Sequence, residues 1–341
     1  MKIIVDAMGG DNAPEAIVKG AVYARDGLGV EICLVGRTED IERCLDGVDR
    51  SGISIVDAPE IITMEDDPST AVRRKKNSSM AIALNLLKNG EGDAMVSAGS
   101  TGALLTGATL IVKRVHGVRR AAMAPVFPSR ENGLMLIDCG ANAECTPEYL
   151  LQFGYMGSFY AKRIMNIDNP RVGLLNIGVE ETKGGTLQHE TYKLLRQAEE
   201  AGRINFVGNV EASTMLFGGV DVVVADGFSG NILLKGIEGT ALFMASMMKD
   251  MFKKNVLTKL AALLCMDGVK AFKKKMDYRE TGGTALIGLS KPVIKAHGSS
   301  DALAIRNAIR QAIGAVEADV AATLAANMDH MVIPKEYQHA E

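Results

Sequence analysis

Several patterns that would place a protein in a class at once are missing from this chain. Its five cysteines include no C-x-x-C pair, which argues against structural zinc and favours reduced thiols in the cytosol over a disulfide framework. No apolar run approaches the roughly 20 residues that a membrane-spanning helix needs. The first residues lack the features of a signal peptide, so we expect a cytoplasmic protein.

The usual fingerprints of nucleotide and metal chemistry are missing as well. Neither G-x-G-x-x-G after a strand nor G-x-x-x-x-G-K-[ST] occurs, and no H-E-x-x-H spacing occurs, so we expect no cofactor and no metal. Without a G-x-S-x-G elbow, serine-hydrolase chemistry has no support. The net charge of −3 gives no indication of a nucleic-acid partner.

What the chain does contain is an alternation of short apolar runs and helical patterns. The runs expected as buried strands are residues 3–6, 31–36, 53–58, 94–99, 134–140, 172–178 and 220–227. Helical patterns cover residues 14–26, 80–88, 147–166 and 299–327, the last as one long helix. This alternation predicts a doubly wound α/β fold with a mostly parallel sheet, and we treat residues 1–341 as a single unit.

Polar and glycine-rich endings follow five of the apolar runs. In open α/β sheets, ligands bind beyond the carboxyl ends of the strands, so we expect these endings to converge on one edge. The candidate residues at that edge are Asp6, Gly9, Gly10, Asn142, Ser229 and Asn231.

The segment of residues 97–102 has the composition of an anion-binding turn. Gly99 and Gly102 let the backbone approach a ligand, and Ser100 and Thr101 add hydroxyl donors at a helix start, which suits inorganic phosphate. An ordinary strand-to-helix turn explains the same residues equally well. Residues 227–231 share both interpretations.

Three further side chains are candidates for chemistry. Lys183 follows a strand ending and could bring an ammonium group to an oxyanion, although a solvated loop lysine fits the pattern too. His297 lies in a turn of small residues and could polarise a carbonyl or carry a proton, although a lone histidine is more often structural. Cys139 follows a strand and could be a nucleophile, but a small buried apolar residue is its better interpretation.

Residues 252–276 combine leucines with many lysines. The apolar spacing of three and four, interrupted near Asp267 and Gly268, predicts an amphipathic helical hairpin that lies on an anionic membrane surface. Packing within an oligomer and docking of an acidic partner are the alternatives.

Six motifs, taken in order, resemble the bacterial acyl carrier protein:phosphate acyltransferase family, PlsX. They cover nearly the whole chain and lie at residues 5–11, 97–103, 138–142, 176–181, 227–231 and 296–299. The resemblance implies a homodimer with a Rossmann-like fold related to phosphotransacetylases and isocitrate-type dehydrogenases. It also implies transfer of a fatty acyl group from acyl carrier protein to inorganic phosphate, attachment to the membrane surface, and delivery of acyl phosphate for phospholipid synthesis to a membrane glycerol-3-phosphate acyltransferase.

Phosphate is already anionic near neutrality, so it needs positioning more than deprotonation. We therefore expect direct attack on the thioester, with phosphate held by Ser100, Thr101 and the backbone after Gly99. Lys183 would neutralise charge, and Asn231 or His297 would polarise the carbonyl.

Two other functions remain open from the sequence. A nicotinamide-dependent decarboxylating dehydrogenase could share the fold, but we find no convincing pair of metal-binding aspartates. A non-catalytic scaffold could instead use the lysine-rich hairpin to recruit acyl carrier protein to membranes.

Overall fold

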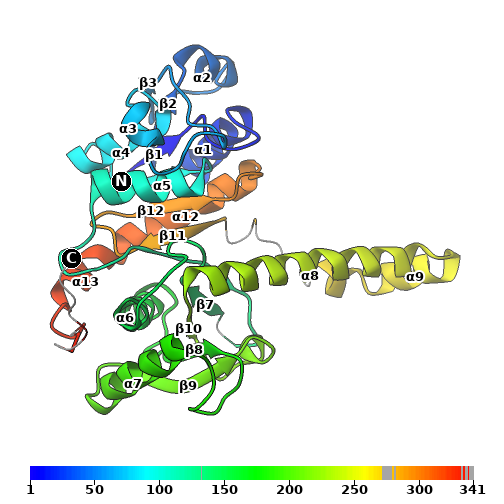
Figure 1. Ribbon diagram of the computed structural model, residues 1–341. Helices are drawn as coiled ribbons and strands as arrows, with labels where there is room; N and C mark the ends of the chain where they lie inside the picture. Colours follow the sequence, from blue (N-terminus) through cyan, green and yellow to red (C-terminus); the bar gives the residue numbers. More distant parts are fainter. Residues whose placement is uncertain (132, 271–278, 280–281, 332, 335–336, 338–341) are drawn as a thin grey trace.

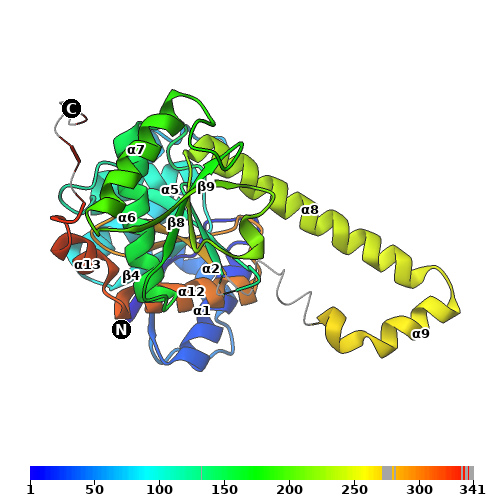
Figure 2. The ribbon, with the colours of Figure 1, turned by 90° about the horizontal axis from the view of Figure 1, so that it is seen from below.

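The computed structural model describes residues 1–341 apart from 132, 271–278, 280–281, 332, 335–336 and 338–341. The described residues form two mixed β-sheets with helices packed on them, and a long helical arm projects from this body (Figures 1 and 2). The predicted α/β class with mostly parallel strands is confirmed. The expectation of one sheet is wrong, because an apolar run shows that a strand is buried without identifying its neighbour.

The first sheet has the strand order β3-β2-β1-β4-β12-β11-β5. Its strands are β1 (Lys2–Asp6), β2 (Glu31–Gly36), β3 (Ile53–Asp57), β4 (Ala94–Ser97), β5 (Ala122–Ala124), β11 (Gly283–Ile287) and β12 (Val293–Ala296). The strands from β3 to β12 in this order are parallel, and β11 is antiparallel to both of its neighbours.

Helices cover both faces of the first sheet. On one face lie α1 (Glu15–Leu28) and α12 (Ala302–Glu317); on the other lie α4 (Ser79–Asn89), α5 (Thr101–Gly107) and the π-helix η1 (Ala108–Val112). Two short helices, α2 (Thr38–Cys44) and α3 (Ala71–Arg74), lie in the connections. Burial on both faces explains why these strands read as nearly continuous apolar runs.

The second sheet has the strand order β6-β7-β10-β8-β9. Its elements are β6 (Val126–Phe127), β7 (Leu134–Ile137), β8 (Arg171–Asn176), β9 (Asn205–Glu211) and β10 (Val222–Val224), with helices α6 (Pro147–Ile164) and α7 (Thr186–Glu200) and the 3-10 turn η2 (Met215–Phe217). Residues of both sheets contribute to one continuous apolar cluster. The two sheets therefore share a core.

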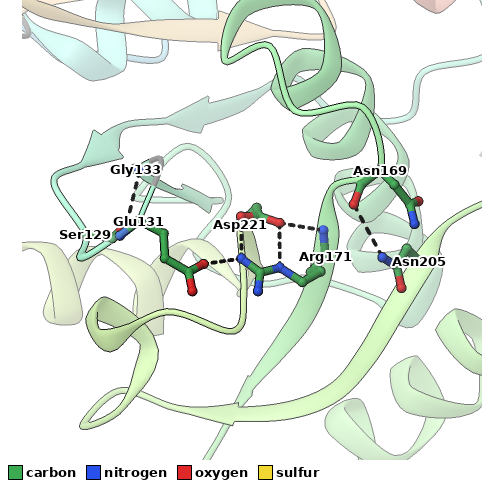
Figure 3. Close-up of polar contacts among 7 residues, drawn as sticks. All are labelled: Ser129, Glu131, Gly133, Asn169, Arg171, Asn205 and Asp221. Atoms are coloured by element: carbon green, nitrogen blue, oxygen red, sulfur yellow. Dashed lines mark hydrogen bonds and ion pairs between the residues drawn. The ribbon is translucent and has the colours of Figure 1, made fainter.

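An ion pair fixes the start of two strands of the second sheet (Figure 3). The Nε and Nη2 atoms of Arg171 donate to the two carboxylate oxygens of Asp221, each at 2.9 Å, and Arg171 also pairs with Glu131. Burial alone would raise the pKa of Asp221, but the hydrogen bonds from Arg171 hold that pKa below its usual value. The pair ties β8 and β10 to the loop that precedes β7.

The expected single helix over residues 299–327 is wrong. Helix α12 ends at Glu317, and α13 (Val320–Ala326) begins after Asp319. Asp319 has a φ of +45°, and its carboxylate accepts a hydrogen bond from the Ala322 N–H. This aspartate caps a new helix, so the apolar spacing continues while the helix axis does not.

The arm consists of α8 (Gly227–Lys253) followed by α9 (Val256–Leu264), which turns back toward the body from the far end of α8 (Figure 2). Residues 267–268 are helical, whereas the chain turns at Lys254 and Asn255, where Asn255 caps α9 by accepting from the Thr258 N–H at 2.9 Å. A turn at Cys265 ends α9, two residues before the interruption predicted near residues 267–268. Residues 271–276 of the predicted hairpin lie outside the described residues.

Two glycines of α8 give a matched test of how the start of this helix, its root at residues 227–231, packs on the body of the protein. A Cβ on Gly230 would lie 1.9 Å from the Asp138 carbonyl oxygen, whereas a Cβ on Gly236 would meet nothing within 4 Å. We predict that Gly230→Ala lowers the free energy of unfolding by roughly 3 kcal/mol or more, because the backbone must shift. Gly236→Ala should raise it by up to about 1 kcal/mol, because alanine favours a helix.

Urea denaturation followed by circular dichroism measures both changes. Equal stability of the two variants would mean that the root of α8 is not packed as described.

Candidate active site

A cavity of about 440 Å³ lies where the two sheets meet, at the root of α8. Its polar lining comes from segments far apart in the sequence: Thr101 follows β4, Gly140 follows β7, Asn231 is in α8, and Lys295 and His297 lie at the end of β12. The structure thus brings together three residues singled out from the sequence, Thr101, Asn231 and His297. The sequence analysis missed Lys295.

Lys295 is a buried lysine, with 8% of its surface exposed. Its ammonium group donates to the carbonyl oxygens of Ala98, at 3.3 Å, and Ala296. Burial lowers the pKa of Lys295 to about 8, against the opposing charges of Asp6 and Asp11. No described residue forms an ion pair with this group, so the cavity holds a cation whose hydrogen-bond partners are neutral carbonyls.

A signal in the sequence could have identified this lysine. It lies inside the apolar run Val293–Ala296, which is buried along its whole length. Lysine is rarely buried without a partner, and a buried charge in a cleft is typical of functional sites.

Asp6 is the carboxylate whose charge opposes the shift of Lys295. Its Oδ2 accepts from the Ser97 hydroxyl at 2.7 Å, and its Oδ1 accepts from the Met8 N–H at 3.3 Å. Burial raises the pKa of Asp6, while hydrogen bonds from the two serines Ser79 and Ser97 and the charge of Lys295 act in the other direction. Asp6 therefore ties the end of β1 to the end of β4 instead of lining the cavity.

The hydrogen bonds at His297 define the tautomer of its neutral ring. The backbone N–H of Ser299 donates to Nδ1 at 3.2 Å, and the Ser299 hydroxyl lies 2.8 Å from the same nitrogen. Because Nδ1 accepts, the neutral ring carries its proton on Nε2. Partial burial lowers the pKa of His297, helped by the nearby charge of Lys235, so the neutral ring with an Nε2–H donor is favoured.

A single carboxylate, Asp138, organises the wall of the cavity formed by residues 138–142. Its Oδ1 accepts from the backbone N–H groups of Met123 (2.8 Å), Cys139 (2.7 Å) and Ala141 (3.2 Å). Its Oδ2 accepts from the N–H and the side-chain amide of Asn142, at 2.6 and 3.0 Å. Asn142, a candidate site residue, thus supports the wall of the site.

The root of α8 packs directly on this loop. The Gly227 N–H donates to the Asn142 carbonyl at 2.8 Å, and a Cβ on Gly227 would lie 2.5 Å from that oxygen. Asn231, one turn further along, lies against Gly140, whose φ is +110°. The glycines of residues 227–230 thus allow the helix to approach the loop closely, which sets the position of Asn231.

The turns after β1 and β4 meet backbone to backbone. A Cβ on Gly9 would lie 2.6 Å from the Gly99 nitrogen, and Gly10, with a φ of +104°, faces the carbonyl of Gly298. Gly9, Gly10 and Gly99 therefore hold three turns together at the edge of the cavity. The role of these three glycines is therefore structural. The Gly99 N–H, in addition, donates to the Ser97 hydroxyl.

The remaining candidates of the proposed phosphate turn divide between two roles. The Ser100 hydroxyl accepts from the Ala103 N–H and caps α5, and Gly102 packs against Pro68. Thr101, the first residue of α5, lines the cavity with Lys295. The N-terminus of α5 is thus directed at the same space as the buried lysine.

Lys183 and Ser229 lie outside this cavity. Lys183 is exposed in the loop between β8 and α7, where its carbonyl accepts from the Asn176 side chain at 3.0 Å. Ser229 and Asn176 line a neighbouring cavity of about 510 Å³. Four of the five strand endings therefore line two separate cavities, and the ending at residues 6–11 lines neither. The catalytic role assigned to Lys183 stays a prediction.

Cys139 lies in the wall of the cavity, but its thiol is not activated as a nucleophile. Its side chain is fully buried, and its Sγ is 3.7 Å from the Leu136 carbonyl oxygen, to which it donates. Burial raises the pKa of the Cys139 thiol far above its ordinary value, and the charge of Asp138 adds to this shift. A thiol held in this form is a poor nucleophile.

Comparisons with known proteins agree with this geometry. A family model described as a fatty acid synthesis protein matches residues 1–323. A phosphate acyltransferase of Thermoanaerobacterium thermosaccharolyticum is 47% identical over 320 residues, which cover 94% of each chain.

The chain belongs to the fatty acid synthesis protein family. The resemblance carried by the six motifs is confirmed, and the chain is an acyltransferase.

Two solved structures share the fold. A phosphotransacetylase of Streptococcus pyogenes superimposes with a TM-score of 0.61 at 20% identity, covering 94% of each chain. A 4-hydroxythreonine-4-phosphate dehydrogenase of Burkholderia phymatum gives a TM-score of 0.52 at 17% identity, covering 92% of this chain and 97% of that one. A fold found in both a transacetylase and a dehydrogenase does not distinguish the two chemistries, whereas the relative at 47% identity does.

Proposed function

We propose that this protein transfers a fatty acyl group from acyl carrier protein to inorganic phosphate, and so supplies acyl phosphate for phospholipid synthesis. The observation that carries the proposal is the cavity at the root of α8, where a buried ammonium group, a helix N-terminus and a neutral imidazole border one space. These groups suit an anion placed beside a carbonyl group that becomes negatively charged. The name shared by the relatives supports the choice of phosphate and an acyl group as reactants.

Phosphate is held, in this proposal, between the start of α5 and Lys295. Thr101 and the backbone N–H groups that open α5 donate to phosphate oxygens, and Ser100 keeps this helix end in place. The ammonium group of Lys295 neutralises the anion from within the protein, where its charge acts in a low dielectric. Lys295 thereby takes the role that the sequence analysis gave to Lys183.

The thioester carbonyl lies, in this proposal, between Asn231 and His297. The amide of Asn231 and the Nε2–H of His297 are donors that stabilise the oxyanion of the tetrahedral intermediate. A phosphate oxygen attacks the carbonyl carbon, and the carbon–sulfur bond then breaks. The proton of the attacking hydrogen phosphate goes to the departing thiolate, so the reaction needs no external acid or base.

Direct attack is favoured over an acyl-enzyme by the state of Cys139. A covalent route needs an ionised thiol, and burial next to Asp138 opposes ionisation of this one. Alignment of two bound reactants supplies the rate advantage instead, roughly 7–11 kcal/mol in favourable cases.

The central test mixes the pure protein with acyl-acyl carrier protein and phosphate. We expect release of the carrier thiol together with an acyl phosphate that hydroxylamine traps, and no acyl label on Cys139 by mass spectrometry. Binding of the carrier without either product would favour the scaffold, and a change in nicotinamide absorbance would favour the dehydrogenase.

The buried lysine gives a prediction with a pH dependence. Lys295→Ala should raise the KM for phosphate about tenfold or more, because a hydrogen bond to a charged group contributes about 1.5–3 kcal/mol. Since only the protonated amine attracts phosphate, kcat/KM for phosphate should fall as the pH rises through about 8. Steady-state kinetics from pH 6 to 10 measure both effects.

Two variants make this prediction specific. Lys295→Arg stays charged over the whole range, so any remaining activity should lack the decline near pH 8. Lys183→Ala should change the KM for phosphate less than Lys295→Ala does. The reverse order of the two alanine variants would return the phosphate-binding role to Lys183.

We further propose that the arm attaches the protein to the membrane surface and that α8 pairs with a second copy. The described part of the chain contains no helix long and apolar enough to cross a membrane. Val256 and Leu257 at the end of the arm and Leu264 at the end of α9 are 77–83% exposed, and Lys253 and Lys254 precede Val256 and Leu257 at the turn. This combination suits the boundary of an anionic bilayer, to which the product would be delivered for a membrane glycerol-3-phosphate acyltransferase.

A homodimer is supported by the apolar surface of α8 itself. Leu242, Phe243 and Met247 are 52–71% exposed along the middle of the helix, away from the end of the arm. An apolar face of this extent on a long helix is typical of helix–helix association.

The membrane proposal predicts the effect of three substitutions in α9. Changing Leu260, Leu263 and Leu264 to glutamate should abolish sedimentation with anionic liposomes, because each buried leucine contributes roughly 1.5–3 kcal/mol and each nearby lysine about 1 kcal/mol. Acyl transfer in solution should be retained, because these residues lie beyond the cavity.

A matched control adds the same charge elsewhere. Leu110, Val207 and Leu303 are apolar residues of the body with 38–42% exposure, and their change to glutamate should leave liposome binding intact. Equal loss in both triple variants would assign the effect to net charge alone. Persistent binding of the α9 variant would remove the arm as the anchor.

A further inference from the structure

The active-site cavity continues beyond its polar groups along the first turns of α8. Leu234, Ile237 and Ala241 follow Asn231 at spacings of three and four and line the same cavity. The ten helical steps from Asn231 to Ala241 span about 15 Å of helix. No described residue of α8 beyond Ala241 contributes to the lining, so the cavity ends beside this small side chain.

The opposite wall of this extension is apolar too. Val126 and Phe127 of β6 and Leu216 of η2 line it, and Phe127, Leu216, Leu234 and Ile237 belong to one apolar cluster. Phe127 is buried, whereas the other three members are only partly covered in the described structure. Apolar surface that is partly covered inside a cavity is suited to an apolar ligand.

Two charged residues on this part of α8 neutralise each other. The Lys235 ammonium group donates to the Glu238 carboxylate at 2.8 Å, and both residues line the cavity. The extension therefore presents no net charge on this wall, in contrast to the cation of Lys295 at the polar end.

We propose that this extension is the subsite for the fatty acyl chain, with Ala241 setting the longest chain that fits. This inference rests on the proposed function. With the thioester carbonyl between Asn231 and His297, the chain has an apolar path along α8, past Leu234 and Ile237 to Ala241. The occupant is a single alkyl chain, because the space begins at the acyl carbonyl and is bounded by apolar walls on both sides.

A substitution at the end of the subsite tests the assignment by chain selectivity. In Ala241→Phe, the ratio of kcat/KM for hexadecanoyl-carrier to kcat/KM for butanoyl-carrier should fall about tenfold, because the added ring occupies the end of the path. Ala245→Phe makes the same change one turn further along, at an exposed position outside the cavity lining. This control should leave the ratio unchanged.

A binding measurement separates failure of the subsite from failure of the proposed function. A fluorescent fatty acid, dansylamino-undecanoic acid, should bind to the wild-type chain, about tenfold more weakly to Ala241→Phe, and with unchanged affinity to Ala245→Phe. This result would support the subsite even if no acyl transfer were found.

Each of the following outcomes would overturn the subsite. One is an equal loss of activity for both chain lengths in Ala241→Phe. Another is an equal effect of the two phenylalanine variants, which would assign the change to the arm. The third is probe binding that only the glutamate variant of α9 removes, which would place the alkyl chain at the end of the arm; absence of probe binding to wild type would instead indicate that a second copy fills the space.

Discussion

The buried carboxylate of Asp138 is the interaction on which the geometry of the site depends. It belongs to the loop after β7 in the second sheet, yet its Oδ1 accepts the N–H of Met123, which lies in β5 of the first sheet. Burial raises the pKa of Asp138, and the hydrogen bonds from Met123, Asn142 and Ala141 oppose that shift. A carboxylate this deep is tolerated because it accepts hydrogen bonds from the Met123 N–H of β5 and from Cys139, Ala141 and Asn142 of its own loop. The two sheets therefore meet at a fixed separation, and the cavity lies at this junction.

The same loop determines where the arm begins. Because Gly227 and Gly230 have no side chains, α8 rests directly on residues 138–142 and can present Asn231 to the cavity. One helix thus forms a wall of the site at its root and an exposed apolar surface further out.

Much of the fold could be predicted from the sequence, because apolar runs mark buried strands and a proline after Thr146 marks the start of α6. The division into two sheets could not, since pairing depends on contacts between distant segments such as Met123 and Asp138. Of the candidate site residues, Thr101, Asn231 and His297 line one cavity, because polar residues at strand ends and helix starts converge. Lys295 was missed because it lies inside a strand whose apolar neighbours suggested only core packing.

The contrast between the two lysines has a physical basis. Lys183 is exposed, so water and salt screen its charge, and holding a long side chain in one geometry costs conformational entropy. Lys295 is already desolvated and held by two hydrogen bonds in the fold, so binding an anion there requires little further loss of freedom. An anion that enters the cavity also relieves the unfavourable burial of an ammonium group whose partners are carbonyl oxygens. A buried cation is for these reasons a better binding site for a small anion than a mobile surface lysine, which is the physical ground for proposing Lys295 as the phosphate-binding residue.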